Sequence, residues 1–219
     1  MPLDRHRTLA AAVELIDEQG LRALTMRRLG VRLGVEAMSL YHYVPSREDL
    51  LDGVVEQVMG ELYGDPEVHM DASHGWQAYV QRLAHGVRRI ALAHPEVFPL
   101  VCTRPSAAPW VKPPLRSLRW MESFLTTLGG CGFADVDAVA AYRAFSSFLL
   151  GHLLLEVSAM GVDTGPVEEP DPRPPKVGDL GEYPNLARLQ HQLAEDHAQE
   201  EFEDALEALL LRLELEVRA

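Results

Sequence analysis

Cysteine and lysine are scarce in this chain of 219 residues, where each occurs only twice. Cys102 and Cys131 are too few for a disulfide framework or for the four ligands of a structural zinc site, so we expect ordinary buried or free thiols. The other 18 basic side chains are arginines, so arginine is a preference of the whole chain. No arginine is therefore a functional candidate by its identity alone.

Long apolar runs are also missing, because polar side chains interrupt every window of eighteen residues. The N-terminal residues MPLDRHRTLAAAVELID mix charges into an amphipathic pattern and lack the continuous apolar stretch of a signal peptide. We therefore expect a cytoplasmic protein with no membrane partner.

Sequence signatures of catalysis are absent as well. The chain has no glycine-rich phosphate loop, no nucleophile elbow and no paired metal site. Its nine histidines show no metal-ligand spacing. We expect no enzyme activity, no cofactor and no bound metal.

Helical periodicity runs along most of the chain, and no segment carries a clear strand signal. The pattern predicts an all-α fold, with a break rich in proline and glycine over residues 161–184. Besides two short helices within residues 25–43, helices are expected at residues 3–19, 46–63, 76–94, 115–128, 134–160, 185–194 and 200–217. Residues 64–75 are expected to form a loop, and residues 95–114 a short helix and turns.

The segment TMRRLGVRLGVEAMSLYHY, residues 25–43, predicts a helix-turn-helix. Thr25 is a natural N-cap for the first helix, and Gly34 can adopt the positive φ that ends it. Leu40 and Val44, four residues apart, give the second helix an inward face. Its other face retains Ala37, Met38, Ser39, Tyr41, His42 and Tyr43. Hydroxyls and arginines bind phosphates and short side chains approach base edges, so this face suits DNA.

The net charge of −13 argues against a nucleic-acid partner until its distribution is considered. Residues 1–50 carry seven basic and seven acidic side chains, so the other 169 residues carry the whole net charge. Residues 22–47 hold five arginines and a single acid, Glu36. An acidic body with a locally basic end is suited to binding DNA at that end. Beside the second helix we assign Arg27 and Arg28 to DNA and leave Arg32 as a solvated side chain.

The segment LTMRRLGVRLGVEAMSLYHYVPSREDLL resembles the TetR family of bacterial transcriptional repressors, and the resemblance covers residues 5–60. It rests on the turn at residues 33–35, the Leu40-Tyr41 pair and the Ser-Arg-Glu sequence before a leucine pair. By position, the resemblance implies base contacts for Arg27, Ala37, Met38 and Ser39. It places Tyr41, Tyr43 and Arg47 near phosphates or bases, and Thr25 at a helix cap near phosphate.

A weaker resemblance, to the tetracycline-repressor subgroup, extends over the C-terminal part. It is carried by Trp76-Gln77, Arg88-Arg89, Thr103-Arg104-Pro105 and the terminal FEDALEALLLRL. The subgroup's metal-binding histidine is replaced by Leu100, and two of its drug-contacting positions are Leu83 and Val87. We expect the fold to carry over and the tetracycline–magnesium specificity to be lost.

Together these features predict a three-helix DNA-binding head, residues 1–50, and a larger helical domain for ligand binding and dimerisation, residues 51–219. The expected ligand pocket is lined by Leu83, Val87, Thr103, Arg104, Pro105, Trp120, Phe145, Phe148 and His152. The Thr-Arg-Pro triplet can equally be a plain turn, and His152 can instead form a buried pair with Glu156. Two helices per subunit, residues 134–160 and 200–217, are expected to form a four-helix homodimer interface containing Leu209 and Leu213, with Leu153 nearby.

The predicted function is a ligand-responsive repressor that binds a near-palindromic double-stranded DNA operator as a homodimer. A small, largely apolar effector, aromatic or polyketide-like and bound without metal, would release it. Two alternatives stay open: a small-molecule-binding protein or enzyme with an incidental helix-turn-helix, and a transcriptional activator of the same fold.

Overall fold

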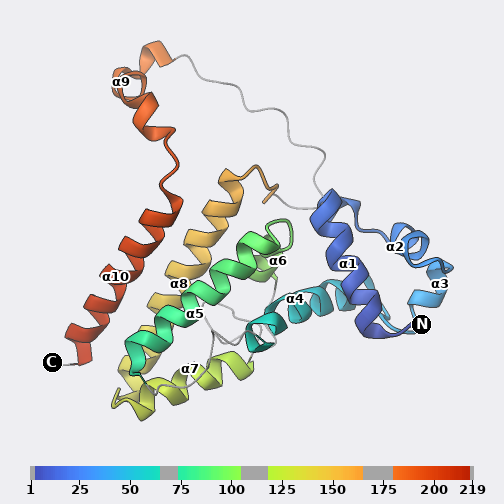
Figure 1. The fold of residues 1–219 in the computed structure, drawn as a ribbon, viewed down its shortest axis with the longest axis horizontal. Coiled ribbons are helices and arrows are strands. Elements are labelled where there is room, and N and C mark those ends of the chain that lie inside the picture. The colour runs from blue at the N-terminus through green and yellow to red at the C-terminus, as the bar shows by residue number, and fades with distance from the viewer. Residues whose placement is uncertain (1–2, 65–73, 105–117, 165–179, 218–219) are drawn as a thin grey trace.

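The computed structural model describes residues 3–64, 74–104, 118–164 and 180–217 (Figure 1). Every regular element in these residues is helical, which confirms the all-α prediction. The α-helices are α1 (Arg5–Gln19), α2 (Met26–Leu33), α3 (Ala37–Leu40), α4 (Arg47–Gly64), α5 (Trp76–Ala93), α6 (Phe98–Thr103), α7 (Leu118–Gly130), α8 (Asp135–Ala159), α9 (Pro184–Leu193) and α10 (Ala198–Val217), with 3-10 turns at Leu21–Ala23 and Leu180–Glu182. Loops were predicted at residues 64–75 and 161–184, and most residues of both segments lie outside the described ranges.

Side-chain caps fix the ends of the N-terminal helices. Thr25 accepts a hydrogen bond from the backbone N–H of Arg28 at 3.2 Å, and Gly34 ends α2 with φ of 69°. At the start of α4, the backbone N–H of Asp49 donates to the Ser46 hydroxyl at 3.0 Å. These caps confirm the helix boundaries predicted from Thr25, Gly34 and Ser46.

The helices form two parts joined by α4 (Figure 1). Helices α1, α2 and α3 lie together at one end of the molecule and form the head. Helix α4 packs against α1 on the head side and against α5 and α6 on the body side. Helix α10 packs against α8 and α5, whereas α9 extends away from the body. Any movement of α4 is therefore shared between the two parts.

Parallel aromatic rings fill the centre of the larger part. Trp120 and Phe124 of α7 and Phe145 of α8 stack on one another with centroids 5.5–6.2 Å apart and planes within 19°. Each such pair adds about 0.5–1.5 kcal/mol beyond the apolar area it buries. The stack joins α7 rigidly to α8.

Helix α8 is long and apolar enough to cross a membrane by length and composition, the one such helix among the described residues. A core helix of a globular protein passes the same test, and α8 packs against α5, α6, α7 and α10. Its outward face is not covered within one chain, since Leu155 is 73% exposed.

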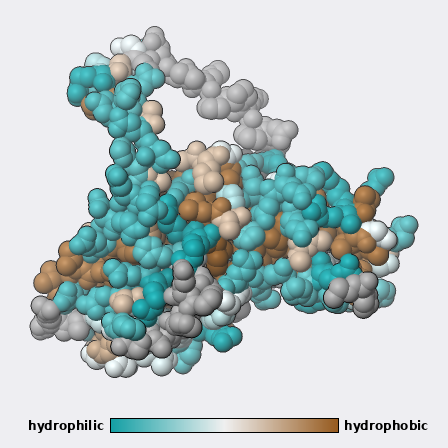
Figure 2. Space-filling view, in the orientation of Figure 1, coloured by the Kyte–Doolittle hydropathy of each residue, from teal (hydrophilic) through white to brown (hydrophobic). Residues whose placement is uncertain are grey.

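Leu209 and Leu213 were expected at a subunit interface, with Leu153 nearby. The placement of Leu213 was wrong, because it is buried within a single chain, as Leu153 is. Leu209 is half-buried, and its place at an interface stays a prediction. Helix α10 turns Phe202, Leu206, Leu210 and Leu213 inward, toward α8 and α5 of its own subunit. The apolar side chains left outside on α10 are Leu211 and Leu215, one turn apart, and apolar surface follows the C-terminal part of this helix in Figure 2.

Candidate DNA-binding face and effector cavity

The turn between α2 and α3 is built on a close backbone approach at Gly30. A Cβ at this position would lie 2.8 Å from the carbonyl oxygen of Val35 and 3.2 Å from the backbone nitrogen of Ala37. The N–H of Val35 donates to the Gly30 carbonyl at 2.9 Å. Only glycine lets the recognition helix α3 begin this close to α2.

A cluster of ion pairs holds α2 on α1. The Arg32 guanidinium donates to Glu18 at 2.7 Å and to Glu14 at 2.9 Å. The hydrogen bond from Arg32 lowers the pKa of Glu18, and the two carboxylates raise the pKa of Arg32. Arg32 is exposed, as expected, but it is also paired with Glu14 and Glu18, which share one face of α1.

The candidate DNA-binding residues come from α2, α3, the turn after α3 and the first residue of α4. Leu40 and Val44 are fully buried, so the other side chains of this segment are left for the outside. Ala37, Ser39 and Tyr43 are half-buried, while Thr25, Arg27, Arg28, Met38, Tyr41, His42 and Arg47 are exposed. The Arg28 guanidinium also donates to the side chain of Gln19, and this hydrogen bond holds it against α1.

An apolar cavity of about 360 Å³ lies in the larger part. Five helices contribute its walls, and the lining consists of Val55, Glu56, Met59, Gly60 and Tyr63 of α4, Val87 of α5, Val101 of α6, Leu118, Arg119 and Trp120 of α7, and Ser146, Leu149 and Leu150 of α8. The Arg119 guanidinium sits 4.3 Å from the centre of the Tyr63 ring. A cavity of this size, apolar with a few polar groups at its edge, is typical of small-molecule sites.

Of the residues predicted to line a pocket, the structure places Val87 and Trp120 on this cavity. Leu83 and Phe145 are fully buried in the core beside it. Phe148 and His152 lie against Phe202 of α10, with ring centroids 6.0 and 5.4 Å away. The Thr103 hydroxyl donates to the Pro99 carbonyl at 2.7 Å, and Pro105 lies outside the described residues.

The predicted pairing of His152 with Glu156 is not found. Glu156 accepts from Arg88 at 2.6 Å, and both side chains are nearly buried. The same guanidinium lies 5.2 Å from the centre of the Phe202 ring. The ion pair therefore ties α5 to α8, and the contact of Arg88 with Phe202 adds α10 to this junction. Glu156 is paired with Arg88 and not, as expected, with His152.

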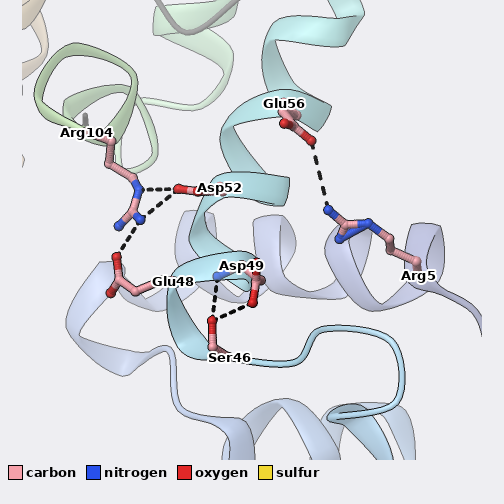
Figure 3. A network of polar contacts seen from close by, with 7 residues as sticks. All are labelled: Arg5, Ser46, Glu48, Asp49, Asp52, Glu56 and Arg104. Atoms are coloured by element: carbon pink, nitrogen blue, oxygen red, sulfur yellow. Dashed lines mark hydrogen bonds and ion pairs between the residues drawn. The ribbon is translucent and has the colours of Figure 1, made fainter. Parts of the chain in front are cut away.

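Arg104 contacts α4 and does not line the cavity (Figure 3). Its guanidinium donates to Asp52 at 2.8 Å and to Glu48 at 2.6 Å. Burial lowers the pKa of Arg104, but the two hydrogen bonds outweigh it and the net shift is upward. On another side of α4, Glu56 pairs with Arg5 of α1 at 3.9 Å (Figure 3). The Arg104 pairs thus tie α4 to the end of α6, whereas the exposed Arg5–Glu56 pair adds little to the packing of α4 against α1.

Two family models match this chain and cover nearly all of it. "Bacterial regulatory proteins, tetR family" matches residues 9–54, and "Tetracyclin repressor-like, C-terminal domain" matches residues 70–215. The chain belongs to the TetR family of transcriptional regulators.

Individual relatives agree with this assignment. The chain is 32% identical over 154 residues to an HTH-type transcriptional regulator of Saccharopolyspora erythraea, covering 70% of this chain and 61% of that one. It therefore spans less than two thirds of that relative's length. A possible TetR family transcriptional regulator from Streptomyces coelicolor A3(2) is 28% identical with a TM-score of 0.75, covering 97% of this chain and 99% of that one. The S. coelicolor TetR family protein ActR in complex with actinorhodin is 26% identical with a TM-score of 0.71, covering 97% and 95%.

In this TetR-family chain, the largest contribution that sequence reasoning missed is that of α4 to the cavity. Val55, Met59 and Tyr63 recur every four residues along one face of α4 and line the cavity. That spacing is visible in the sequence and predicts the helix over residues 46–63, but it does not show that the helix faces a cavity.

Two properties of the described residues concern metal binding and thiol chemistry. These residues contain no group of three or more histidine, cysteine or acidic side chains that could hold a metal ion. Burial raises the pKa of the Cys102 thiol to about 12, which suppresses its thiolate at neutral pH. The site as described is suited to binding.

Proposed function

We propose that this TetR-family regulator is a ligand-responsive repressor that binds a near-palindromic operator in the cytoplasm as a homodimer. Residues 1–50 serve as the DNA-binding domain and residues 51–219 as the ligand-binding and dimerisation domain. One observation carries the proposal: α4 begins with Arg47 of the candidate DNA-binding face and lines the effector cavity with Val55, Met59 and Tyr63. A single rigid helix thus connects the two functions.

On DNA, the exposed side chains divide into two roles. Tyr41 and Arg47 have the hydroxyl and guanidinium that bind phosphate without sequence preference. Arg27 and Ser39 are the candidates for hydrogen bonds to base edges, each worth roughly 1–3 kcal/mol of discrimination. Thr25, Arg28, Ala37, Met38, His42 and Tyr43 complete the proposed face.

Dimerisation is proposed to use the outward faces of α8 and α10. Leu155 is 73% exposed and Leu215 is 70% exposed. An apolar face of this kind is usually covered in solution. A second copy related by a twofold axis would cover both helices at once and would place two recognition helices roughly 34–36 Å apart, in successive major grooves.

The proposed effector is a small, largely apolar, planar molecule bound without metal in the cavity of about 360 Å³. Trp120 belongs both to the cavity wall and to the parallel ring stack, so a flat ligand can extend that stack. Titration with tetracycline, with and without magnesium, tests the proposal that the effector binds without metal. Magnesium-dependent release of DNA at micromolar drug would overturn it.

Release is proposed to work through a shift of α4. The helix forms one wall of the cavity, is tied to α6 by Arg104 and packs against α1. An effector that binds the shifted arrangement more tightly moves both heads and alters their spacing. The shift in DNA affinity is limited to the effector's differential affinity for the two arrangements.

Selection of bound sequences from random double-stranded DNA tests the proposed function. The parent protein should enrich an inverted repeat with half-site centres about 10–10.5 base pairs, or a multiple of that, apart. The Tyr41→Ala variant should bind the enriched DNA and unrelated DNA more weakly by similar factors, whereas Ser39→Ala should change the preferred base. Enrichment of no sequence by correctly folded protein would refute the proposal.

A further inference from the structure

Two large apolar side chains are strongly exposed in the head. Val31 of α2 is 77% exposed and Met38 of α3 is 74% exposed. Figure 2 shows apolar surface among polar surface at this end of the molecule. Met38 is the second residue of the recognition helix, flanked by half-buried Ala37 and Ser39, and the core does not use it.

The chemistry of Met38 limits what it can recognise. A thioether donates no hydrogen bond and is a weak acceptor, so Met38 cannot match the polar donor and acceptor pattern of a base edge. In the major groove the apolar group that distinguishes a base pair is the 5-methyl group of thymine. Methionine is unbranched and polarisable, so it can adapt its shape to such a methyl.

The position of Met38 is suited to this contact. The N-terminal residues of a recognition helix approach base edges, and Met38 lies in the single turn of α3. Gly30 holds the start of α3 close to α2, which fixes where this turn stands relative to the rest of the head. Val31 lies on α2, outside the recognition helix, and serves as the matched exposed residue.

We infer that Met38 reads the 5-methyl group of one thymine in each operator half-site. The inference rests on the proposed operator binding and adds the base that this position selects. It makes the preference at that position depend on a methyl group and not on a hydrogen bond. Uracil, which pairs as thymine does but lacks the methyl, should therefore be discriminated.

The test replaces each thymine of the selected operator in turn by deoxyuridine and measures affinity by fluorescence anisotropy at fixed salt. One thymine per half-site should be sensitive. Replacing it in one half-site should weaken binding about fourfold, which is the loss expected when one buried methyl group is removed. Replacing it in both half-sites should weaken binding about fifteenfold. In the Met38→Ala variant the same replacement should change affinity by less than about 1.5-fold. The Val31→Ala variant should keep the full sensitivity of the parent.

The possible outcomes separate this inference from the proposed function. A parent protein that binds the operator specifically but tolerates every uracil replacement overturns the inference and leaves the proposed function standing. Equal uracil sensitivity in Met38→Ala also overturns it, because another residue would then read the methyl. If folded protein selects no operator, the proposed function fails first and the inference fails with it.

Discussion

Replacing Gly30 by alanine should damage DNA binding far more than it damages the fold. A Cβ at Gly30 would lie 2.8 Å from the Val35 carbonyl oxygen, whereas ordinary contacts are 3.4–4 Å. The atoms it meets are backbone atoms of the turn, which cannot rotate away. We therefore expect α3 to move by about 0.6 Å or more relative to α2.

Two opposing terms set the stability of Gly30→Ala. Overpacking of a tight site costs about 1–3 kcal/mol. Alanine in a helix interior recovers about 1 kcal/mol relative to glycine. The net loss should be about 0–2 kcal/mol, small enough for the variant to stay folded. A displaced recognition helix should lose at least one base contact per half-site, or about 1–3 kcal/mol of binding in each.

The assay pairs urea unfolding with operator binding by anisotropy at matched salt. Gly129→Ala is the control, because Gly129 lies in the last turn of α7, outside the head and the cavity lining, and has no atom within 4 Å of an added Cβ. The control should keep its stability or gain up to about 1 kcal/mol, and it should keep its operator affinity. If Gly30→Ala binds operator as tightly as the control does, the close approach of α2 and α3 is not what positions the DNA-binding face.

Four further predictions follow from named contacts. Arg104→Gln should lower the free energy of unfolding by about 1–2 kcal/mol in urea titration, because it removes charged hydrogen bonds to α4; no change would show that α6 and α4 are not tied there. Burial, and then nearby carboxylates, raise the pKa of Glu96, so its stabilising contribution is lost as pH rises through that pKa. Glu96→Gln should accordingly have a higher melting temperature than the parent at pH 8, an advantage that disappears near pH 4; an equal advantage at both pH values would contradict this. Because burial raises the pKa of Cys102 to about 12, iodoacetamide at pH 8 should label it at least about 100-fold more slowly in native than in unfolded protein, as followed by mass spectrometry. Leu215→Glu should convert a sedimenting dimer to monomer, and a parent that sediments as a monomer at micromolar concentration would remove the interface.

Local signals in the sequence predicted most of the helices well. The caps at Thr25, Gly34 and Ser46 and the inward pair Leu40 and Val44 act over four residues or fewer, so they can be recognised without the fold. The exposed residues of α3 could then be deduced by elimination. The family resemblance rested on the same short segment.

Long-range pairings could not be deduced in this way. The position of Arg104 in the sequence predicts a pocket residue. In the structure its guanidinium instead donates to Glu48 and Asp52, which lie more than 50 residues earlier in the chain. His152 and Glu156 have the spacing of a pair, yet Arg88 from α5 binds Glu156. Periodicity showed that α10 has an apolar seam but not whether its own chain or a partner covers it. In each case a competing contact from a distant helix decides the outcome.

The central claim is that α2 and α3 read a specific DNA sequence. The most direct measurement is the ratio of two dissociation constants for the parent protein, for its selected inverted repeat and for the same duplex with scrambled half-sites, at one salt concentration. The account predicts a ratio of at least about 1,000 in favour of the inverted repeat. A ratio near one, with both affinities falling together as salt rises, would mean that the basic head binds DNA only through its charge and would contradict the account.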